Sequence, residues 1–473
     1  MTRLTPAVIR RIGLGCAGGI ALGLGVALVG EASIGPKATP SPGAIAVDIG
    51  PGFVPASSGV LGDRSPVQQS QSMQLQSTQL QANQSQDSQS QYSQSQYSQS
   101  QYSQSHALPA LCPVTDPRQQ LAPRIGLDTQ LWGDGDIGKA DRSALLQAID
   151  HSLRYLNTAE AEQAYAAYPI AGVSRDRVYR SLRRFRVLLQ WATSPQQLQR
   201  WVRQEFDFYQ ATGHDGQGSV DFTGYFEPQY QASLTPSATY RYPLYRRPPD
   251  LDRWPQPHPT RLALEGADGL QGAEGPLAGL ELVWLADRLE AYLVQVQGSA
   301  RLELVQGGSL SVGYDGRTEY SYTSLGKALV EAGRFSLEEL TLPKVLGYFE
   351  EFPAELDLYI PRNDRFIFFR ETQGAPPTGS LGVPVTADRS IAADKSLMPP
   401  GALALLVTDL PYGPTPDQLE PYAVSRYVLD QDTGGAIKGA GRVDIFLGSG
   451  ALAGARAGLV NTPGQLYYLL LKN

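Results

Sequence analysis

The sequence has very few of the residues that build disulfide, metal and histidine-dependent catalytic sites. Among its 473 residues only two are cysteines, Cys16 and Cys112, and only four are histidines. Two cysteines so far apart exclude a disulfide framework and offer no CxxC metal or redox motif. The histidines, at 106, 151, 214 and 258, show neither metal-ligand spacing nor the local signature of a serine or cysteine nucleophile. We therefore expect no bound metal and no cofactor.

Positive charge is also scarce. The chain has 39 Lys and Arg against 46 Asp and Glu, a net charge of −7, and no basic run in its body. Proteins that bind nucleic acid carry basic patches, so nucleic acid is not an expected partner. The length leaves room for two folded domains beside any tails, since domains usually have about 100–200 residues.

The N-terminal residues carry the pattern of an export signal. Arg3, Arg10 and Arg11 precede an uncharged run over 12–30 that is rich in Gly, Ala, Leu and Val. A helix that spans a bilayer needs about 20 apolar residues. Residues 1–34 therefore fit either a cleaved signal peptide or an uncleaved membrane anchor, and a lipid on Cys16 is a weaker third alternative. Each alternative places the rest of the chain outside the cytoplasm, in the periplasm.

Residues 35–136 have the composition of a linker. Pro, Gly and Ser dominate first, and from 68 to 105 the chain is almost only Gln and Ser, with QYSQS repeated at Gln91, Gln96 and Gln101. Such a segment contains too little apolar surface to offset the entropy of ordering it. We predict a disordered linker, which serves as a tether or is dispensable.

A helical section follows from residue 137. Apolar residues spaced by three and four predict one helix that begins after Asp141 and a second over 178–189. Trp191 and Trp201 are predicted to lie in the core. The arginines at 183, 184 and 186 are predicted to form a solvated face.

From Val220 onward the apolar pattern changes to that of strands. One helix is expected at 324–332. Short runs separated by polar or glycine-containing turns predict strands at 281–285, 291–296, 301–305, 310–314, 365–370, 401–408, 423–430, 443–446 and 466–471. Strands spaced so closely favour barrels over a wound parallel sheet. The predicted fold is mainly β with N-terminal helices.

One glycine-rich stretch, residues 430–450, stands out as a candidate site. Asp432 and Asp444 bracket it, and Lys438 lies between them. Residues 442–447 alternate as a strand, so Asp444 and Phe446 share one face while the apolar residues between them face the other. A carboxylate beside an aromatic ring suits an acid that handles sugar. The alternative is a polar turn that closes a hairpin.

Four stretches together resemble a known family. They are FTGYFEP at 222–228, QVQGSARL at 295–302, the long stretch 379–406 and DTGGAIKGAGRVDIFLGSG at 432–450. In this order they resemble the MltA-type membrane-bound lytic murein transglycosylases (glycoside hydrolase family 102). The last two stretches resemble the three-aspartate (3D) domain of that family, whose aspartates would be Asp394, Asp432 and Asp444. The sequence departs from the family pattern at Ala300 and Leu447, neither of which is an aspartate of the site.

The resemblance implies a particular architecture. The family fold is a double-psi β-barrel with a second β-barrel domain inserted into it and a groove between the two. Mapped onto this chain, the helical section and the first barrel strands would occupy 137–228, the inserted barrel 229–355, and the 3D barrel 356–473.

The resemblance also implies an activity, the cleavage of the β-1,4 bond between N-acetylmuramic acid and N-acetylglucosamine in peptidoglycan. Asp444 would act first as acid and then as base to form a 1,6-anhydro product, with Asp432 and Asp394 in support. Glu227 is a rival for the acid. The residues expected to contact the glycan are Thr223, Tyr225, Glu227, Gln297, Ser299, Gly434, Gly435, Lys438 and Phe446.

Two other functions remain open at this point. One is a peptidoglycan hydrolase that uses water and two carboxylates, and the other is a wall-binding protein that no longer cuts. In every case the expected partner is a peptidoglycan glycan strand. The membrane becomes a second partner if the N-terminal segment stays uncleaved, and the sequence indicates no particular wall-synthesis protein.

Overall fold

The computed structural model describes residues 109–115, 122–133, 139–166, 168–336 and 342–473. The predicted N-terminal signal or anchor and the Gln/Ser-rich tract lie outside these residues. Among the helices that are described, none combines the length and the apolar character needed to cross a bilayer.

Six strands form a closed barrel. Their order is β14-β11-β12-β10-β13-β3, and β3 pairs back with β14 to complete the circle. The strands are β3 (Val220–Glu227), β10 (Ser390–Ala392), β11 (Leu403–Tyr412), β12 (Glu420–Asp432), β13 (Arg442–Ser449) and β14 (Asn461–Leu471). Most neighbours are antiparallel, but β13 runs parallel to β3 and β10 runs parallel to β12. Two further strands, β2 (Phe206–Ala211) and β1 (Leu111–Pro113), extend the sheet from β14.

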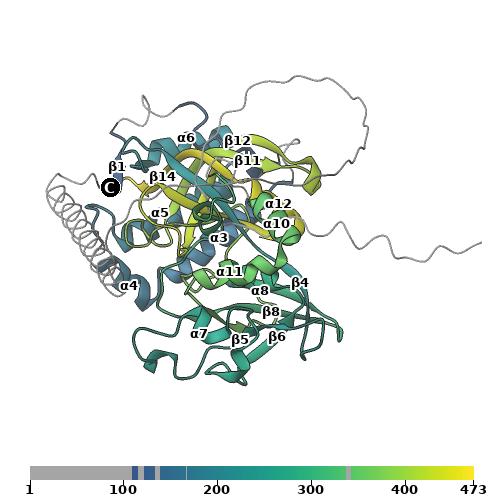
Figure 1. Cartoon of the computed structure of the whole chain (residues 1–473). Coiled ribbons are helices and arrows are strands. Elements are labelled where there is room, and N and C mark those ends of the chain that lie inside the picture. The colour runs from purple at the N-terminus through teal and green to yellow at the C-terminus, as the bar shows by residue number, and fades with distance from the viewer. Residues whose placement is uncertain (1–108, 116–121, 134–138, 167, 337–341) are drawn as a thin grey trace, which may run out of the picture. The chain divides into compact units, whose positions relative to one another are not determined.

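A second sheet lies between β3 and β10 in the sequence. Its order is β5-β6-β4-β7-β8-β9, and a bridge between Arg246 and Phe369 brings the two edges together. The strands are β4 (Gln229–Ser233), β5 (Tyr242–Tyr245), β6 (Glu281–Leu285), β7 (Ser299–Leu304), β8 (Ser309–Arg317) and β9 (Ile367–Glu371). We call it the second barrel; in Figure 1, β4, β5, β6 and β8 lie together, apart from β11, β12 and β14.

The insertion extends beyond the boundary expected at residue 355. Strand β9 pairs antiparallel with β8, with Arg317 opposite Ile367 and Gly313 opposite Arg370. Residues 367–371 therefore hydrogen-bond within the second barrel. We propose a boundary near residue 371 in place of 355.

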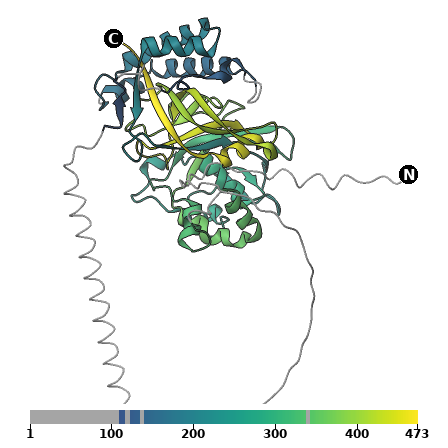
Figure 2. The same ribbon diagram turned by 90° about the horizontal axis from the view of Figure 1, so that it is seen from above.

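Helices cover one side of the first barrel. In Figure 2 the blue helices that precede β2 lie beside its yellow and green strands. These helices are α3 (Arg142–Tyr155), α4 (Ala159–Ala166), α5 (Arg175–Trp191) and α6 (Pro195–Glu205), and α12 (Ala451–Leu459) packs on β3 and β13. The hydroxyls of Ser174 and Ser194 accept hydrogen bonds from the first turns of α5 and α6, which explains where these two helices begin.

The second barrel carries shorter helices, and one of them overturns a strand prediction. Residues 291–296 belong to α8 (Arg288–Gln297), not to a strand. The Asp287 side chain caps the N-terminus, and Gly298 adopts a φ of 81° at the C-terminus. These two caps outweigh the strand preference of the valines between them. The other helices are α7 (Arg261–Glu265), α9 (Leu325–Glu331), α10 (Leu342–Glu351) and α11 (Leu356–Tyr359).

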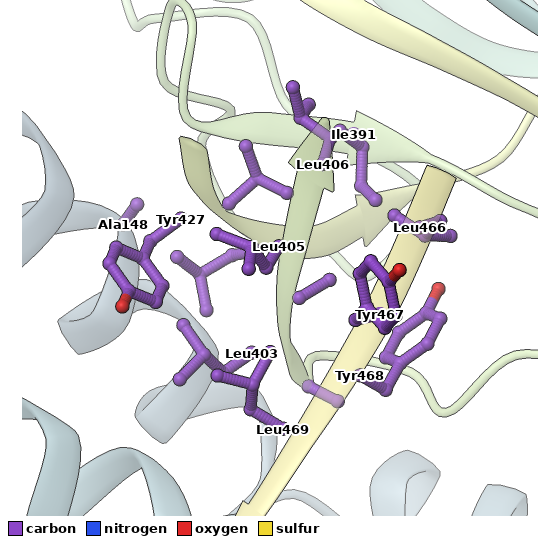
Figure 3. Packing of buried hydrophobic residues seen from close by; sticks show 14 of the residues in the cluster. Ala148, Ile391, Leu403, Leu405, Leu406, Tyr427, Leu466, Tyr467, Tyr468 and Leu469 are labelled. Carbon is purple, nitrogen blue, oxygen red and sulfur yellow. The ribbon is translucent and has the colours of Figure 1, made fainter. Parts of the chain in front are cut away.

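The core of the first barrel is buried on both faces of its strands. Leu405 and Leu406 are neighbours on β11 that point to opposite faces, yet both are 0% exposed. Figure 3 shows these leucines between Tyr427 and Tyr468, with Ala148 of α3 alongside. Because helices cover the outside of these strands, the strands read as continuous apolar runs instead of alternating ones.

The two predicted core tryptophans behave differently from each other. Trp201 packs half-buried against the core, but Trp191 is 66% exposed, so its assignment to the core was wrong. Trp191 is the last residue of α5.

Two arginines of the predicted solvated face are ion-paired, Arg184 with Glu205 and Arg186 with Asp150.

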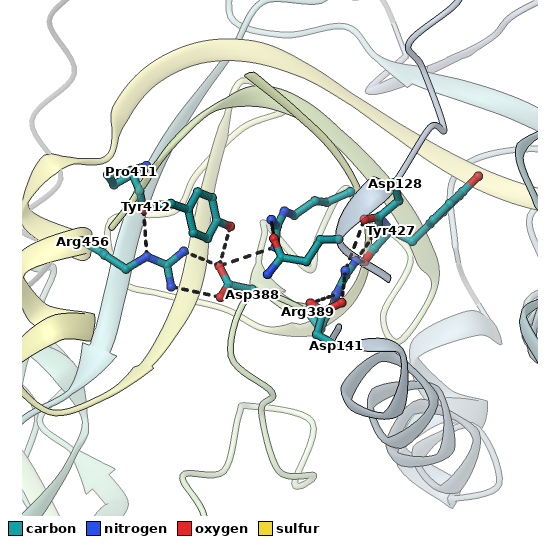
Figure 4. A network of polar contacts seen from close by, with 10 residues as sticks. Asp128, Asp141, Asp388, Arg389, Pro411, Tyr412, Tyr427 and Arg456 are labelled. Atoms are coloured by element: carbon teal, nitrogen blue, oxygen red, sulfur yellow. Dashed lines mark hydrogen bonds and ion pairs between the residues drawn. The ribbon is translucent and has the colours of Figure 1, made fainter. Parts of the chain in front are cut away.

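A buried ion cluster ties the segment before α3 to the barrel. Arg389 is fully buried and donates to Asp128 at 2.5 Å and to Asp141 at 2.6 Å (Figure 4). Asp128 also accepts from the backbone N–H of Tyr427. Asp128 is therefore fastened to the barrel, and residues 111–113 pair with β2. We propose that the linker, which the sequence extended to 136, ends earlier.

A second cluster in Figure 4 fastens α12 to the barrel. Arg456 donates to both oxygens of Asp388, at 2.6 and 3.0 Å, and to the carbonyl of Pro411 at 2.9 Å. Burial opposes ionisation of Asp388, but the Arg456 guanidinium holds the pKa of this carboxyl at about 2.

We predict that Arg389→Met destabilises the protein strongly. Removing one partner of a buried ion pair costs about 3–5 kcal/mol because the other charge stays buried and uncompensated. Urea unfolding should show this loss in the free energy of unfolding. The matched control is Arg180→Met, which removes an exposed ion pair with Asp176 that is worth about 0–1 kcal/mol. Equal losses in the two variants would contradict the structural role of Arg389.

Candidate active site

A pocket of about 630 Å³ is lined by residues of both barrels. The first barrel contributes side chains from β3 and β13 and the loop after β12. The second barrel contributes the end of α8, the start of β7, and residues of β8 and β9. Ten residues predicted for the site line this pocket: Tyr225, Glu227, Gln297, Ser299, Asp432, Gly434, Gly435, Lys438, Asp444 and Phe446. Thr223 and Asp394 do not line it.

Strand β13 presents the two faces that its sequence predicts. Val443, Ile445 and Leu447 are buried in the core of the first barrel, while Asp444 and Phe446 line the pocket. The expected alternation is confirmed. Strand β13 lies between β10 and β3, so the backbone around Asp444 is held by hydrogen bonds on both sides.

Asp444 is a buried carboxyl that forms no ion pair in the described part of the chain. It is 9% exposed, and its Oδ1 accepts no hydrogen bond from the described residues. Burial raises the pKa of Asp444 to about 7, the nearby charge of Asp432 adds to the rise, and Thr223 and Arg442 oppose it. Near neutral pH, a substantial fraction of Asp444 therefore carries a proton that it can donate.

Asp432 is also buried, but hydrogen bonds occupy both of its oxygens. Tyr225 donates to Oδ2 at 2.8 Å, and the N–H groups of Ser380 and Thr433 each donate to Oδ1 at 2.8 Å. Burial raises the pKa of Asp432, and these three hydrogen bonds oppose the rise. The ring of Tyr225 packs against Phe446 with centroids 5.2 Å apart, so Asp432 holds the aromatic pair beside Asp444.

Asp394 fixes the glycine-rich loop from outside the pocket. Its carboxylate accepts from Ser396 and, at 2.9 Å, from the N–H of Gly439, which adopts a φ of 83°. Burial opposes ionisation, but these hydrogen bonds and the charge of Lys438 hold the pKa of Asp394 below its ordinary value. Thr223 lies next to Asp444 in the β3–β13 pairing and is 3% exposed, which places it behind the site instead of on its wall.

Glu227, the rival acid, is tied to a cation. Its Oε2 accepts from Nε of Arg301 at 2.7 Å and from the hydroxyl of Ser449 at 2.5 Å, and its side chain is 1% exposed. Glu227 lines the pocket, but its Oε2 is already occupied by these two donors.

Several residues of the pocket were absent from the sequence prediction. The second barrel contributes Arg317, Arg365 and Arg370, and the guanidinium of Arg365 lies so close to Gly435 that a Cβ there would come within 2.0 Å of it. A larger residue at this point of the loop would require the Arg365 guanidinium to move. Arginines near strand ends resemble solvated charges in the sequence, so nothing local marked them.

No three His, Cys, Asp or Glu side chains come together as possible metal ligands within the residues that the structure describes. Asp444, Asp432 and Asp394 are instead each surrounded by protein groups of different kinds.

Comparison with known proteins gives consistent relatives. Two family models match the chain, the MltA specific insert domain over residues 221–370 and the 3D domain over residues 389–470. The end of the first match, at 370, agrees with an insertion that includes most of β9. The membrane-bound lytic murein transglycosylase A of Escherichia coli (strain K12) is 31% identical over 266 residues, which are 56% of this chain and 69% of that protein. The Vibrio cholerae protein of the same name is 30% identical over 291 residues, 59% of this chain and 75% of the relative.

Solved structures agree with the fold. A membrane-bound lytic murein transglycosylase from Agrobacterium tumefaciens has a TM-score of 0.57 and 27% identity, and the match covers 74% of this chain and 97% of that one. The E. coli MltA structure with bound chitohexaose has a TM-score of 0.58 at 24% identity, over 77% and 95% of the two chains, and it shows similarity of fold alone. From these matches and the two barrels around a shared pocket, the chain belongs to the family of the membrane-bound lytic murein transglycosylase A proteins.

Proposed function

We propose that the protein is a lytic transglycosylase that cleaves the β-1,4 bond between N-acetylmuramic acid and N-acetylglucosamine in peptidoglycan. The observation that carries this proposal is Asp444, a buried carboxyl on the pocket wall whose pKa is raised to about 7 and which forms no ion pair with a described residue. The names of the relatives support the same substrate.

In the first step, protonated Asp444 donates its proton to the glycosidic oxygen. The bond between that oxygen and C1 of the muramoyl sugar breaks, and the glucosamine leaves with the proton. Positive charge develops at C1, and the new carboxylate of Asp444 stabilises it. A raised pKa suits this step because an acid works best when its pKa lies near the working pH.

In the second step, the carboxylate of Asp444 removes the proton from the C6 hydroxyl of the same muramoyl sugar. The C6 oxygen bonds to C1 and gives a 1,6-anhydro end, while Asp444 regains its proton. No water is consumed.

The neighbouring carboxylates support a mechanism with a single acid. An ordinary glycosidase needs a second carboxylate as nucleophile or as base for water. Here Glu227 is ion-paired with Arg301, and Asp432 already accepts three hydrogen bonds. Neither carboxylate is free to attack C1 or to activate water. The nucleophile is therefore the C6 hydroxyl of the substrate itself.

We propose that the protein acts outside the cytoplasm, in the periplasm, where its substrate lies. The basic residues before the uncharged run at 12–30 support export, and the relatives are named membrane-bound. Residues 1–34 would then serve as the cleaved signal or as the anchor.

Replacing Asp444 by Asn should abolish cleavage and leave binding intact. The amide keeps the shape but can neither donate nor recover the proton, and general acid–base catalysis is worth about 10²–10⁴-fold. Mass spectrometry of anhydromuropeptides released from purified murein measures the loss, and cosedimentation with murein measures binding.

We expect Asp432→Asn to be only partly impaired in the release of anhydromuropeptides. If Asp444→Asn kept more than about a tenth of the activity while Glu227→Gln lost it, the acid would be Glu227. A reducing end without the anhydro ring would instead indicate a hydrolase.

Turnover should fall as the pH rises through about 7, because the reaction starts from protonated Asp444. Beyond that point the loss should approach tenfold per pH unit for one essential proton. Asp432→Asn removes a negative charge that raises the pKa of Asp444, so the decline should begin at a lower pH in this variant. A decline that starts at the same pH in both proteins would refute the coupling.

The raised pKa of Asp444 also makes the free energy of unfolding depend on pH. The folded-state pKa of Asp444 lies above the ordinary value of 3.8, so the folded protein binds more protons than the unfolded chain between pH 3.8 and about 7. The contribution of this group to stability is therefore lost as the pH rises across that window. Relative to the unchanged protein, Asp444→Asn should gain stability from pH 4 to pH 7 and show a constant difference above it.

Activity should survive exhaustive chelation. The proposed chemistry uses one carboxyl and the C6 hydroxyl of the substrate, and a step of this kind needs no Lewis acid. Anhydromuropeptide release after dialysis against EDTA tests this expectation. A loss that calcium or magnesium restores would make Asp394, Asp432 and Asp444 candidate ligands.

A further inference from the structure

The carboxyls that line the pocket come from one barrel and most of its cations from the other; Lys438, on the loop after β12, is a cation of the first barrel. The carboxyls Asp444, Asp432 and Glu227 all come from the first barrel. From the β8–β9 side of the second barrel come three arginines, Arg317, Arg365 and Arg370. A neutral sugar chain gives no reason for such a group of cations.

The pairing of β8 with β9 brings these arginines together. Arg317 ends β8 opposite Ile367, two residues beyond Arg365, and Arg370 lies opposite Gly313. Burial lowers the pKa of Arg365, and the charge of Arg317 lowers it further. The second effect shows that the two guanidinium groups lie close to each other. Holding two like charges this close is unfavourable unless an anion binds between them.

Two of the three arginines lack a protein anion in the described structure. Arg370 pairs with Asp315 at 3.1 Å, but no described Asp or Glu forms an ion pair with Arg317 or Arg365. Arg365 is nevertheless held in place. Its Nε donates to the carbonyl of Tyr320 at 2.7 Å, and its guanidinium packs against Gly435 of the loop that follows Asp432. Its terminal nitrogens thus lie at the pocket with a fixed orientation.

We propose that Arg317 and Arg365 form a carboxylate subsite that recognises the acidic substituent of the muramoyl sugar. This inference rests on the proposed function. Of the two sugars in the strand, only the muramoyl sugar carries a lactyl ether. Its carboxylate is free in a peptide-free strand, and in a substituted strand the stem peptide supplies carboxylates instead. The planar guanidinium of arginine matches a carboxylate through two parallel hydrogen bonds.

Such a subsite would decide which bond is cut. The 1,6-anhydro ring must form on the muramoyl sugar, so this sugar must be the one whose C1 lies at Asp444. The two sugars have the same pyranose ring and the same acetamido group, so the acidic substituent is the largest difference between them. Cations from the second barrel, facing the acid from the first, select the muramoyl sugar by charge.

Binding to an inactive protein tests the proposal. In full-length Asp444→Asn, the changes Arg317→Gln, Arg365→Gln and both together are compared for affinity toward peptide-free murein strands, peptide-bearing murein strands and neutral chitohexaose. The matched control, Arg183→Gln, removes the same charge from an exposed position on α5. Charge-assisted hydrogen bonds are strong, so we expect the double change to weaken murein binding roughly 10- to 100-fold. Affinity for chitohexaose should stay within about twofold.

The two murein ligands identify the carboxylate. A loss for peptide-free strands alone assigns the subsite to the lactyl carboxylate, and a loss only for peptide-bearing strands assigns it to the stem peptide. A loss for both strands means that the subsite accepts either carboxylate of the acidic substituent. A salt dependence of murein binding that the double change abolishes would support either assignment. The proposal is overturned if chitohexaose binding falls as much as murein binding, or if the double change matches the Arg183→Gln control.

A failure to fold does not confound the result. Arg317 is exposed, so Arg317→Gln alone should fold. If Arg365→Gln does not fold, Arg365→Lys replaces it, because lysine keeps the charge. The test is also separate from that of the proposed function. If the unchanged protein released no anhydromuropeptides, the proposed lyase activity would be refuted. The binding comparison tests a different question, whether the pocket binds a carboxylate.

Discussion

The pairing of β3 with β13 and β14 is the interaction on which the rest of the structure depends. Strand β3 leads into the second barrel, and β13 and β14 lie near the end of the chain, so their hydrogen bonds close the first barrel across the whole insertion. Parallel neighbours such as β3 and β13 cannot be joined by a tight turn. The inserted barrel is, in effect, part of a very long connection between them. Because the insertion leaves directly from β3, the same pairing that closes the barrel also holds the second barrel beside Asp444.

Three aspartates and one glutamate in or beside this site show how surroundings assign roles to the same chemical group. Asp394 accepts backbone and hydroxyl hydrogen bonds and orders the loop, and Glu227 is neutralised by Arg301. Asp432 holds Tyr225 and adds negative charge near Asp444. Only Asp444 is buried with an oxygen that no described group satisfies. An unsatisfied buried carboxyl is costly, and a raised pKa is the way in which a protein lowers this cost. In the proposed mechanism, this raised pKa keeps a proton available for cleavage.

Much of the site could be predicted from the sequence because its determinants are local. The strict alternation over 442–447 separates Asp444 and Phe446 from the core residues between them, and the structure has the same two faces. The sequence also placed Gly435 at the site, and the guanidinium of Arg365 packs against this glycine. The errors arose where competing signals had similar strength. The apolar residues at 291–296 suit a strand or a helix, and the caps at Asp287 and Gly298 decide for the helix.

The sequence by itself determined the strand-rich class, the order of the elements and the identity of the candidate acid, because periodicity, turn residues and motif spacing act over a few residues at a time. Only the tertiary structure decided which charges meet. Asp128 and Asp141 neutralise Arg389 from far along the chain, and Arg317 and Arg365 become neighbours because β8 pairs with β9. The protonation of Asp444 is equally a tertiary property. It follows from removal of the carboxyl from water and from the nearby charge of Asp432, and neither distance nor burial can be read from residue order.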